Sequence, residues 1–280
     1  MTLTLGFSPC PNDTFIFDAL IHKKIDTAGL DFDVVYEDVE TLNKMAFDNH
    51  LDITKLSFHA FAFALKNYAL LDSGSALGHG VGPLLITADE SRTPEFVREH
   101  APELTVAIPG TYTTANFLLN LAFPLLQQKR VHLFSDIENA VSNNKVDLGL
   151  IIHESRFTYQ RKGLYKVLDL GNFWEQKTNL PIPLGGIVVN RRIDPEIQYK
   201  INHLIHQSIE FAFQNPKSSL DFIKSHSQEM EDEVISKHIN LYVNDYSLGL
   251  GTSGREAVTK LFEEARSLQV IPAYQENIFA

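Results

Sequence analysis

Short apolar runs alternate with stretches of helical periodicity along the first part of the chain. Residues 2–7, 31–36 and 51–56 are apolar or alternate between apolar and polar positions, which predicts β-strands. Between and after these runs, apolar side chains recur three or four residues apart, the spacing of one helix face. These predicted helices span residues 15–21, 39–49 and 57–65. The β-α-β-α-β-α order is typical of a parallel sheet flanked by helices.

The same alternation restarts after the polar stretch at residues 89–92. The predicted strands of this second series are 104–108, 131–134, 147–152 and 164–170, and its predicted helices are 94–100, 115–126 and 136–144. Two further strand patterns, at 81–88 and 184–190, connect the two series. From Pro195 onward the pattern is helical.

The chain is therefore predicted to be an α/β protein with two lobes joined by two hinge crossings, near residues 88 and 187. The first lobe comprises residues 1–88 and 187–280, including the C-terminal helices, and residues 89–186 form a second lobe inserted into it. Each lobe is expected to contain a mainly parallel sheet flanked by helices. A cleft between lobes is a preferred position for a ligand pocket.

Charge and cysteine content narrow the classes of partner. The formal net charge is −11 at pH 7, which disfavours nucleic acid and anionic membranes but still allows a small anionic ligand in a locally positive pocket. No apolar run approaches the roughly 20 residues that span a bilayer, and no signal segment is recognised, so we predict no membrane insertion. A single cysteine, Cys10, suits a reducing compartment, and we expect a cytoplasmic protein. No oligomeric state is predicted.

Four segments place a small, hydroxylated or ionisable residue between a strand and the start of a helix. They are Ser8–Thr14, Lys55–Ser57, Gly110–Ala115 and His153–Glu154. The first turn of a helix offers unpaired backbone N–H groups and a partial positive charge, which bind carboxylate or phosphate oxygens. Asn12 and Asp13, in the first segment, are predicted substrate-binding residues, and the hydroxyls of Ser57, Thr113 and Thr114 would add donors. The alternative is that each of these side chains only caps its own helix.

His153 is the strongest candidate for catalysis. It follows a short apolar run, Asp147–Ile152, so we expect it at the carboxyl end of a strand, where ligands bind in open α/β sheets. An imidazole titrates near neutral pH, as a general base requires. A histidine of the core and a metal ligand are the alternatives, although no His-Glu-x-x-His or similar spacing surrounds it, and no metal is predicted. Glu154 or Arg156 could orient the ring or the substrate, or lie at the surface.

Other patterns carry less information. Cys10 could be a nucleophile whose pKa is lowered by the start of a helix, or a small buried apolar residue. Gly249–Gly254 matches G-x-G-x-x-G but follows a helical pattern, so we predict a loop in which Ser253 caps the last helix, and no dinucleotide cofactor. We expect His203 and His206 on a partly exposed helix face. Trp174, Phe173 and Tyr159 could line a ring-binding cleft or belong to the core.

Four sequence blocks together resemble one enzyme family. They are Ser-Pro-Cys-Pro-Asn-Asp-Thr-Phe at residues 8–15, Thr-Lys-Leu-Ser at 54–57, Pro-Gly-Thr-Tyr-Thr-Thr-Ala at 109–115 and Gly-Leu-Ile-Ile-His-Glu at 149–154. In this order they resemble the 1,4-dihydroxy-6-naphthoate synthases of the futalosine route to menaquinone. The likeness covers nearly the whole chain, although residues 228–248 match no motif.

The resemblance implies a periplasmic-binding-protein-like type II fold used as a cytoplasmic, cofactor-independent lyase. The implied substrate is cyclic dehypoxanthine futalosine, a small carboxylate-bearing molecule, which is cleaved to 1,4-dihydroxy-6-naphthoate and dihydroxyacetone. The proton-abstracting histidine of the family falls on His153. Its substrate contacts fall on Lys55, Leu56 and Ser57 and on Thr113, Thr114 and Ala115.

Three other functions remain open at this point. A non-catalytic solute-binding protein of the same fold would require export. A sister enzyme, chorismate dehydratase, has a different opening block from Ser8–Asp13. A cysteine-dependent hydrolase would use Cys10, and the sequence does not decide whether Cys10 contacts a ligand.

Overall fold

The computed structural model describes residues 1–227 and 231–280, which form two compact units. The first unit comprises Met1–Gly78 with Pro183–Ala280, and the second comprises His79–Ile182. Of the segment that matched no motif, residues 228–230 lie outside the described part of the chain. The chain crosses between the units at 78/79 and 182/183, in both cases earlier in the sequence than the predicted positions near 88 and 187.

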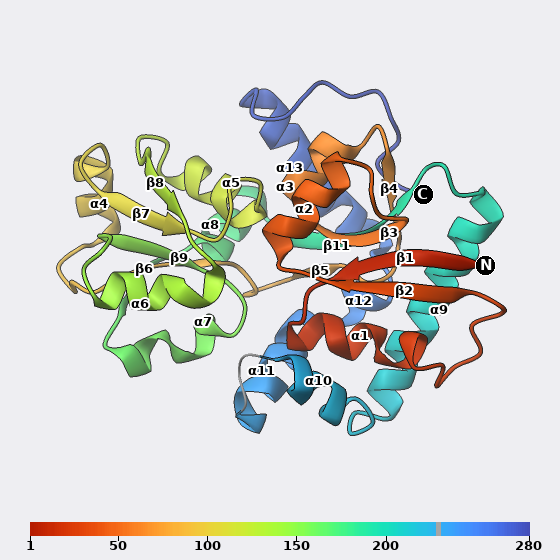
Figure 1. Ribbon diagram of the computed structural model, residues 1–280. Coiled ribbons are helices and arrows are strands. Elements are labelled where there is room, and N and C mark those ends of the chain that lie inside the picture. Colours follow the sequence, from red (N-terminus) through yellow and green to blue (C-terminus); the bar gives the residue numbers. More distant parts are fainter. Residues whose placement is uncertain (228–230) are drawn as a thin grey trace. The chain divides into compact units, whose positions relative to one another are not determined.

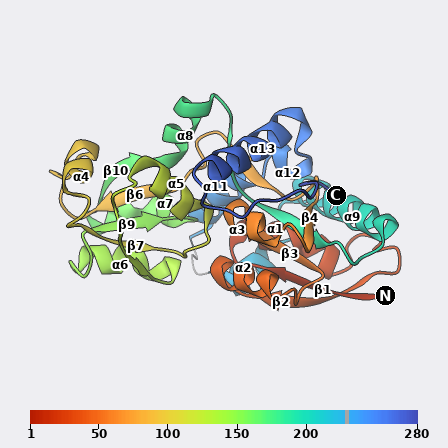
Figure 2. The same ribbon diagram turned by 90° about the horizontal axis from the view of Figure 1, so that it is seen from above.

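The first unit is built on a mixed sheet. Its strands, in spatial order, are β2 (Asp31–Tyr36), β1 (Thr2–Phe7), β3 (Ile53–Ser57), β11 (Ile182–Asn190) and β4 (Tyr68–Leu70), with β5 (Ala76–Gly78) paired to β11. Figure 2 shows β1, β2 and β3 side by side. These three are parallel, but β11 runs antiparallel to both β3 and β4. The expectation of a mainly parallel sheet is thus confirmed for β1, β2, β3 and β4, which run in one direction, whereas β11 returns from the second unit in the opposite direction.

Helices cover both faces of the first sheet. Figure 1 shows α2, α3 and α13 on one face and α1, α10 and α11 on the other. Together with the long α9 and the short α12, these helices are α1 (Pro11–Ile21), α2 (Val39–Phe47), α3 (Phe58–Ala64), α9 (Pro195–Gln214), α10 (Leu220–His226), α11 (Asp232–Tyr242), α12 (Asp245–Leu248) and α13 (Gly251–Ser267). Ser208 of α9 donates to the Ile16 carbonyl and accepts from the Leu20 N–H, so a buried polar contact fixes α9 on α1. The apolar core around it buries Leu5, Phe17 and Ile205.

The second unit also contains a mixed sheet. Its strand order is β10 (Tyr165–Asp169), β6 (Leu84–Thr87), β9 (Leu148–Ile151), β7 (Thr105–Ile108) and β8 (Gln128–Val131). The strands β7, β8 and β9 are parallel, whereas β6 is antiparallel to β9 and β10. The strand predicted at 81–88 to lead out of the first lobe therefore belongs to the second sheet. Its antiparallel partners are distant in sequence, so the local pattern could not show the sheet to which it belongs.

Helices and short 3₁₀ turns flank this sheet. Figure 1 shows α5 and α8 on one face and α6 on the other. The elements are α4 (Pro94–His100), α5 (Thr114–Ala122), η1 (Phe134–Asp136), α6 (Ile137–Ser142), α7 (Ser155–Thr158), η2 (Tyr159–Lys162) and α8 (Leu170–Thr178). Helix α5 ends before Pro124, whose ring is incompatible with a continuing helix. Strand β8 ends at Val131 instead of spanning 131–134, because its register follows its pairing with β7 and leaves the apolar Val131 and Leu133 exposed at the edge.

The backbone of Gly82 lies against the first turn of α8. A Cβ atom on Gly82 would lie 2.2 Å from the Gly171 nitrogen. Arg156 fixes this region, since it donates to the Gly82 carbonyl and pairs with Asp169 at 2.8 Å. Asp169 in turn caps α8 by accepting from the N–H of Gly171 at 2.9 Å. Arg156 therefore has a structural role in the second unit.

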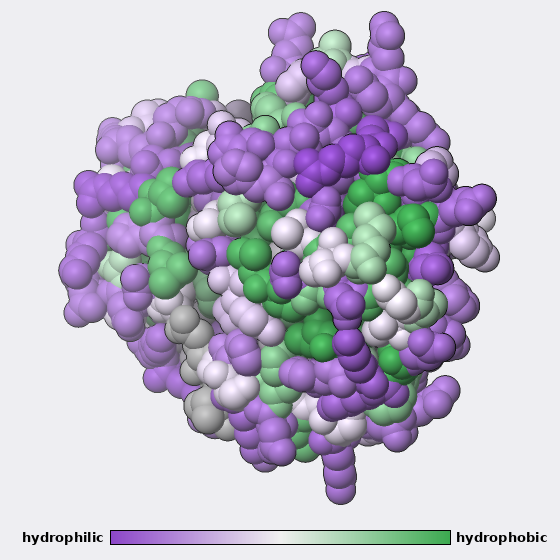
Figure 3. Space-filling model, turned by 45° about the vertical axis from the view of Figure 1, so that its right-hand side comes forward, coloured by the Kyte–Doolittle hydropathy of each residue, from purple (hydrophilic) through white to green (hydrophobic). Residues whose placement is uncertain are grey.

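Within the described residues, no helix combines the length and apolar character needed to cross a membrane. Large apolar side chains at the surface include Tyr199 and Leu125. Figure 3 shows apolar and polar residues intermingled on the face that it presents.

Replacing Gly82 by Ala should lower the free energy of unfolding by about 3 kcal/mol, because the added methyl group meets backbone atoms that cannot rotate away. Gly163→Ala is the matched control: Gly163 has a φ of +70° but open space around its Cβ position, so the cost should be about 1 kcal/mol of backbone strain. Urea denaturation measures both changes. Equal losses for the two variants would contradict the close approach of Gly82 and Gly171.

Candidate active site

The carboxylate of Asp13 lies buried in the first turn of α1. It accepts hydrogen bonds from the Ser8 hydroxyl at 2.7 Å and from the Ser8 N–H at 3.3 Å. The Asn12 amide donates to the other oxygen at 2.8 Å. The acidic side chain thus points back to the end of β1 and supplies the negative charge that the start of a helix favours. Asp13 and Asn12 are committed to contacts inside the first unit.

Lys55, on β3, completes this cluster. Its ammonium group lies 2.9 Å from the Asp13 carboxylate and donates to the Gly74 carbonyl at 3.0 Å. Both side chains are almost fully buried, at 7% and 3% exposure. A buried charge is tolerated only when a partner and hydrogen bonds compensate it, so this pair ties α1, β3 and the loop before β5 together. The structure places Lys55 as the partner of Asp13.

Ser57 ends β3, directly before α3. Its N–H donates to the Asn43 amide oxygen at 3.1 Å, and its hydroxyl lies 3.4 Å from the Asn43 amide nitrogen. Within the described residues the Ser57 hydroxyl makes no capping bond to α3. The capping alternative is therefore wrong for Ser57. Leu56 is buried, and its carbonyl is so close to Gly185 that a Cβ there would lie 2.6 Å away.

In the second unit, Thr113 caps α5. Its hydroxyl accepts from the Asn116 N–H at 3.2 Å and donates to the Gly110 carbonyl at 2.9 Å. The capping alternative is correct for this residue, whose hydroxyl is committed within the turn. Thr114 and Ala115 follow as the first two residues of α5 and are also buried.

Lys129 on β8 supports the same turn, although no sequence pattern pointed to it. Its ammonium group donates to the Asn116 amide oxygen at 2.9 Å and to Asn120. Asn116 donates to the Thr111 carbonyl at 2.8 Å, so the lysine is linked to the turn through one side chain. Burial lowers the pKa of Lys129 to about 8. Lys129 lies outside the strand predicted at 131–134, so the sequence pattern gave no signal for this residue.

His153 lies two residues beyond the end of β9. Its φ of +57° is in the left-handed region, which is uncommon for a residue with a side chain and costs about 1–3 kcal/mol. The residue is half-buried, and its ring lies 4.9 Å from the ring of Phe134, centroid to centroid. The expected position at a strand end is therefore correct. Because the side chain keeps solvent exposure, His153 is not a residue of the closed core.

Glu138 of α6 holds the turn after His153 in place. The buried Glu138 carboxylate accepts from the Ser155 hydroxyl at 3.2 Å and pairs with Lys162 at 2.9 Å. These contacts fix the start of α7. The sequence did not indicate this role of Glu138, because a glutamate on a short helix is usually exposed to solvent.

Comparison with known proteins identifies the family. A sequence-family model described as "Menaquinone biosynthesis" matches residues 3–267. A curated relative named 1,4-dihydroxy-6-naphthoate synthase, from Thermus thermophilus, is 44% identical and covers 95% of this chain and 94% of its own. One of the same name from Streptomyces coelicolor is 39% identical, with coverages of 100% and 98%. The chain belongs to the 1,4-dihydroxy-6-naphthoate synthase family of menaquinone biosynthesis.

Solved structures show the fold. A crystal structure of protein AF1704 from Archaeoglobus fulgidus has a TM-score of 0.89 at 34% identity, covering 96% of this chain and 98% of its own. The alkanesulfonate-binding protein SsuA of Xanthomonas axonopodis pv. citri, at 11% identity, has a TM-score of 0.72 with coverages of 97% and 94%. The predicted periplasmic-binding-protein-like fold and the predicted lyase of the naphthoate synthase family are thus confirmed.

Several weaker candidates have ordinary structural positions in this family member. Trp174 is fully buried and donates to the Pro181 carbonyl, and Tyr159 belongs to the core of the second unit, so the ring-binding interpretation is wrong for both. Phe173 is half-buried. Cys10 is buried, at 4% exposure. The predicted loop at Gly249–Gly254 is wrong at its second half, because α13 already begins at Gly251 and Ser253 lies inside the helix.

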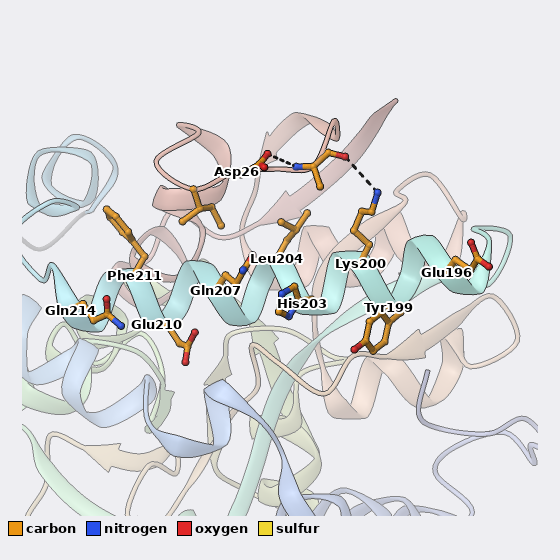
Figure 4. A pocket seen from close by; sticks show the side chains of 12 residues that line it. Asp26, Glu196, Tyr199, Lys200, His203, Leu204, Gln207, Glu210, Phe211 and Gln214 are labelled. Atoms are coloured by element: carbon orange, nitrogen blue, oxygen red, sulfur yellow. Dashed lines mark hydrogen bonds between the residues drawn. The ribbon is translucent and has the colours of Figure 1, made fainter.

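A groove of about 820 Å³ runs along α9 in the first unit. Figure 4 shows that most of its side chains come from this one helix, with Lys200 directed to the carbonyl of Ala28. His203 lines the groove, while His206 donates to the Leu248 carbonyl; both lie on the partly exposed face that was predicted. The charged side chains of the groove do not point to one common place. None of the predicted catalytic or substrate-binding residues is among the residues that line it.

Replacing Lys55 by Met should lower the free energy of unfolding by about 3–5 kcal/mol, because Asp13 would remain buried without its counter-charge. Lys237→Met is the matched control, since Lys237 pairs with Glu233 at the surface and its loss should cost about 0.5 kcal/mol. Urea denaturation at pH 7 measures both. Similar losses in the two variants would show that the Asp13–Lys55 pair is not buried as described.

The lowered pKa of Lys129 predicts a pH dependence of stability. Between pH 8 and 10.5 the unfolded chain still holds a proton that the folded chain has released, so the stability of the parent protein relative to Lys129→Met should rise across this window. Urea denaturation from pH 7 to 10.5 measures the difference. Lys166→Met, at an exposed position, is the matched control. A difference that stays constant with pH would exclude the shift.

Proposed function

We propose that this enzyme converts cyclic dehypoxanthine futalosine to 1,4-dihydroxy-6-naphthoate and dihydroxyacetone, in the cytoplasm. The observation that carries the proposal is the near full-length identity of 44% and 39% to two curated proteins named for the formation of this naphthoate. The four blocks that resemble the family add residue-level support, because each of them ends a strand of the structure or begins a helix.

His153 is the proposed base. The left-handed turn at the end of β9 presents the imidazole beside Phe134, while Glu138 and Ser155 hold the residues that follow. The strain of such a turn persists only where many surrounding contacts hold the backbone in place. Residues strained in this way are frequent at active sites. A half-buried ring can exchange protons with a ligand and with solvent, as a general base must.

The proposed reaction is a carbon–carbon cleavage of the retro-aldol type. His153 removes a proton from the substrate, the bond to the sugar remnant breaks, and aromatisation of the new ring drives the reaction. Bond cleavage and proton transfer balance without an external oxidant or reductant, so the proposal includes no redox cofactor and no metal. Proton transfer by a positioned side chain contributes about 10²–10⁴-fold in rate.

Substrate contacts are proposed at two sets of residues. Lys55–Ser57 at the end of β3 and Thr113–Ala115 at the start of α5 are the positions that match the family. Asn12 and Asp13 have a supporting part in this proposal, because their polar groups hold Lys55 and the end of β1. The carboxylate of the substrate would be bound by helix N–H groups and by the ammonium of Lys55.

The wild-type protein, incubated with cyclic dehypoxanthine futalosine without added metal, should release 1,4-dihydroxy-6-naphthoate, as measured by mass spectrometry. His153→Asn should lower kcat by about 10²–10⁴-fold while the substrate still binds, because asparagine accepts the left-handed backbone but is no base.

His50→Asn, at an exposed position, is the control and should keep the parental rate. A near-parental kcat of His153→Asn would show that His153 is not the base. If the wild type releases no naphthoate but forms 3-enolpyruvylbenzoate from chorismate, the proposed reaction itself is wrong.

A further inference from the structure

His238 is a fully buried histidine in the segment of the chain that matched no motif. It lies on α11, which packs against α1. Its Nε2 atom lies 2.9 Å from the amide oxygen of Asn12, a residue 226 positions away in the sequence. Its ring also contacts Tyr242 at 4.7 Å between centroids. A buried imidazole aimed at the start of α1 calls for an explanation beyond packing.

The direction of this hydrogen bond follows from its neighbours. The Asp13 carboxylate pairs with the Lys55 ammonium group at 2.9 Å, and a carboxylate in an ion pair only accepts hydrogen bonds. The Asn12 group that faces Asp13 at 2.8 Å must therefore be the NH₂ group, which leaves its oxygen facing the histidine. An amide oxygen also only accepts, so the proton resides on Nε2 of His238, and the histidine is the donor.

A directed chain of donors results. His238 donates to Asn12, Asn12 donates to Asp13, and Lys55 donates to the same Asp13 oxygen and to the Gly74 carbonyl. Hydrogen bonds arranged in series polarise one another, and a buried network depends on every member. The position of the Lys55 ammonium group is thereby linked to a side chain on α11.

We propose that His238 is a positioning residue of the substrate site: through Asn12 it sets the Asp13 carboxylate and with it the Lys55 ammonium group. This inference rests on the proposed function, in which Lys55 contacts the substrate. His238 contributes no proton to the reaction, because Asn12 and Asp13 stand between it and Lys55. Its loss therefore affects substrate binding and leaves the chemical step, assigned to His153, nearly unchanged.

The decisive comparison uses two replacements of His238. His238→Phe keeps an aromatic ring but removes the donor, and KM for cyclic dehypoxanthine futalosine should rise about tenfold with kcat nearly unchanged, the size expected for one buried hydrogen bond. His238→Gln carries an amide N–H that can reach the position of Nε2, and it should restore KM to within about threefold of the parent. Steady-state kinetics well below the unfolding temperature of each variant measure both parameters.

His206→Phe is the matched control. His206 also donates a hydrogen bond inside the first unit, at 2.8 Å to the Leu248 carbonyl, but among the described residues its ring makes no hydrogen bond to Asn12 or Asp13. If His238 and His206 both had a purely structural role, His238→Phe and His206→Phe would each lower the thermal stability and leave KM unchanged. A parental KM in folded His238→Phe, or a failure of His238→Gln to restore KM, overturns the proposal.

A second readout does not require turnover. In ¹⁵N NMR of the wild type, the His238 ring should appear as the Nε2–H tautomer. His238→Phe, or His238→Leu if the Phe variant does not fold, should shift the side-chain signals of Asn12 and Lys55. A proton on Nδ1 alone, or unchanged Lys55 signals in the Phe variant, contradicts the positioning role. If the wild type lacks activity but these shifts occur, the proposed reaction fails while the link from His238 to Lys55 stands.

Discussion

The buried ion pair between Asp13 and Lys55 is the interaction on which the first unit depends. Two charges almost free of solvent contact are stable together only when their remaining hydrogen bonds are also made. Here Ser8, Asn12 and the Gly74 carbonyl make them, so the end of β1, the start of α1, strand β3 and a loop must all be in place at once. The apolar core supplies stability, and the ion pair makes one arrangement of the strand ends much more favourable than others.

In the second unit, close packing and a strained backbone turn fix the arrangement of the elements. Gly82 and Gly171 approach so closely that neither has room for a side chain, and Arg156 and Asp169 fix that contact. The adjoining turn holds His153 in a left-handed conformation, with Glu138 bonded to Ser155 below it. The proposed base, His153, benefits from such a support, because a side chain that is already oriented loses little entropy when it reacts.

The start of a helix attracts anions, but the structure shows that such a start can already be occupied. In α1 the chain's own Asp13 provides the negative charge, and in α5 the Thr113 hydroxyl is used within its turn. The residues proposed to contact the substrate are therefore held by supporting residues such as Asn43, Lys129 and His238. A site of this kind is formed by two groups of residues: those that contact the ligand and those that hold the first group in position.

The sequence by itself determined the α/β class, most helices and strands, the family and the position of His153 at a strand end. Each of these follows from local periodicity, from residues next to one another, or from motifs of a few residues. Only the tertiary structure decided the antiparallel course of β11, the membership of β6 in the second sheet, the left-handed backbone of His153 and the contact between His238 and Asn12. The reason is physical: strand partners and buried hydrogen bonds join residues far apart in the chain, and their free energies depend on burial and geometry that no local pattern contains.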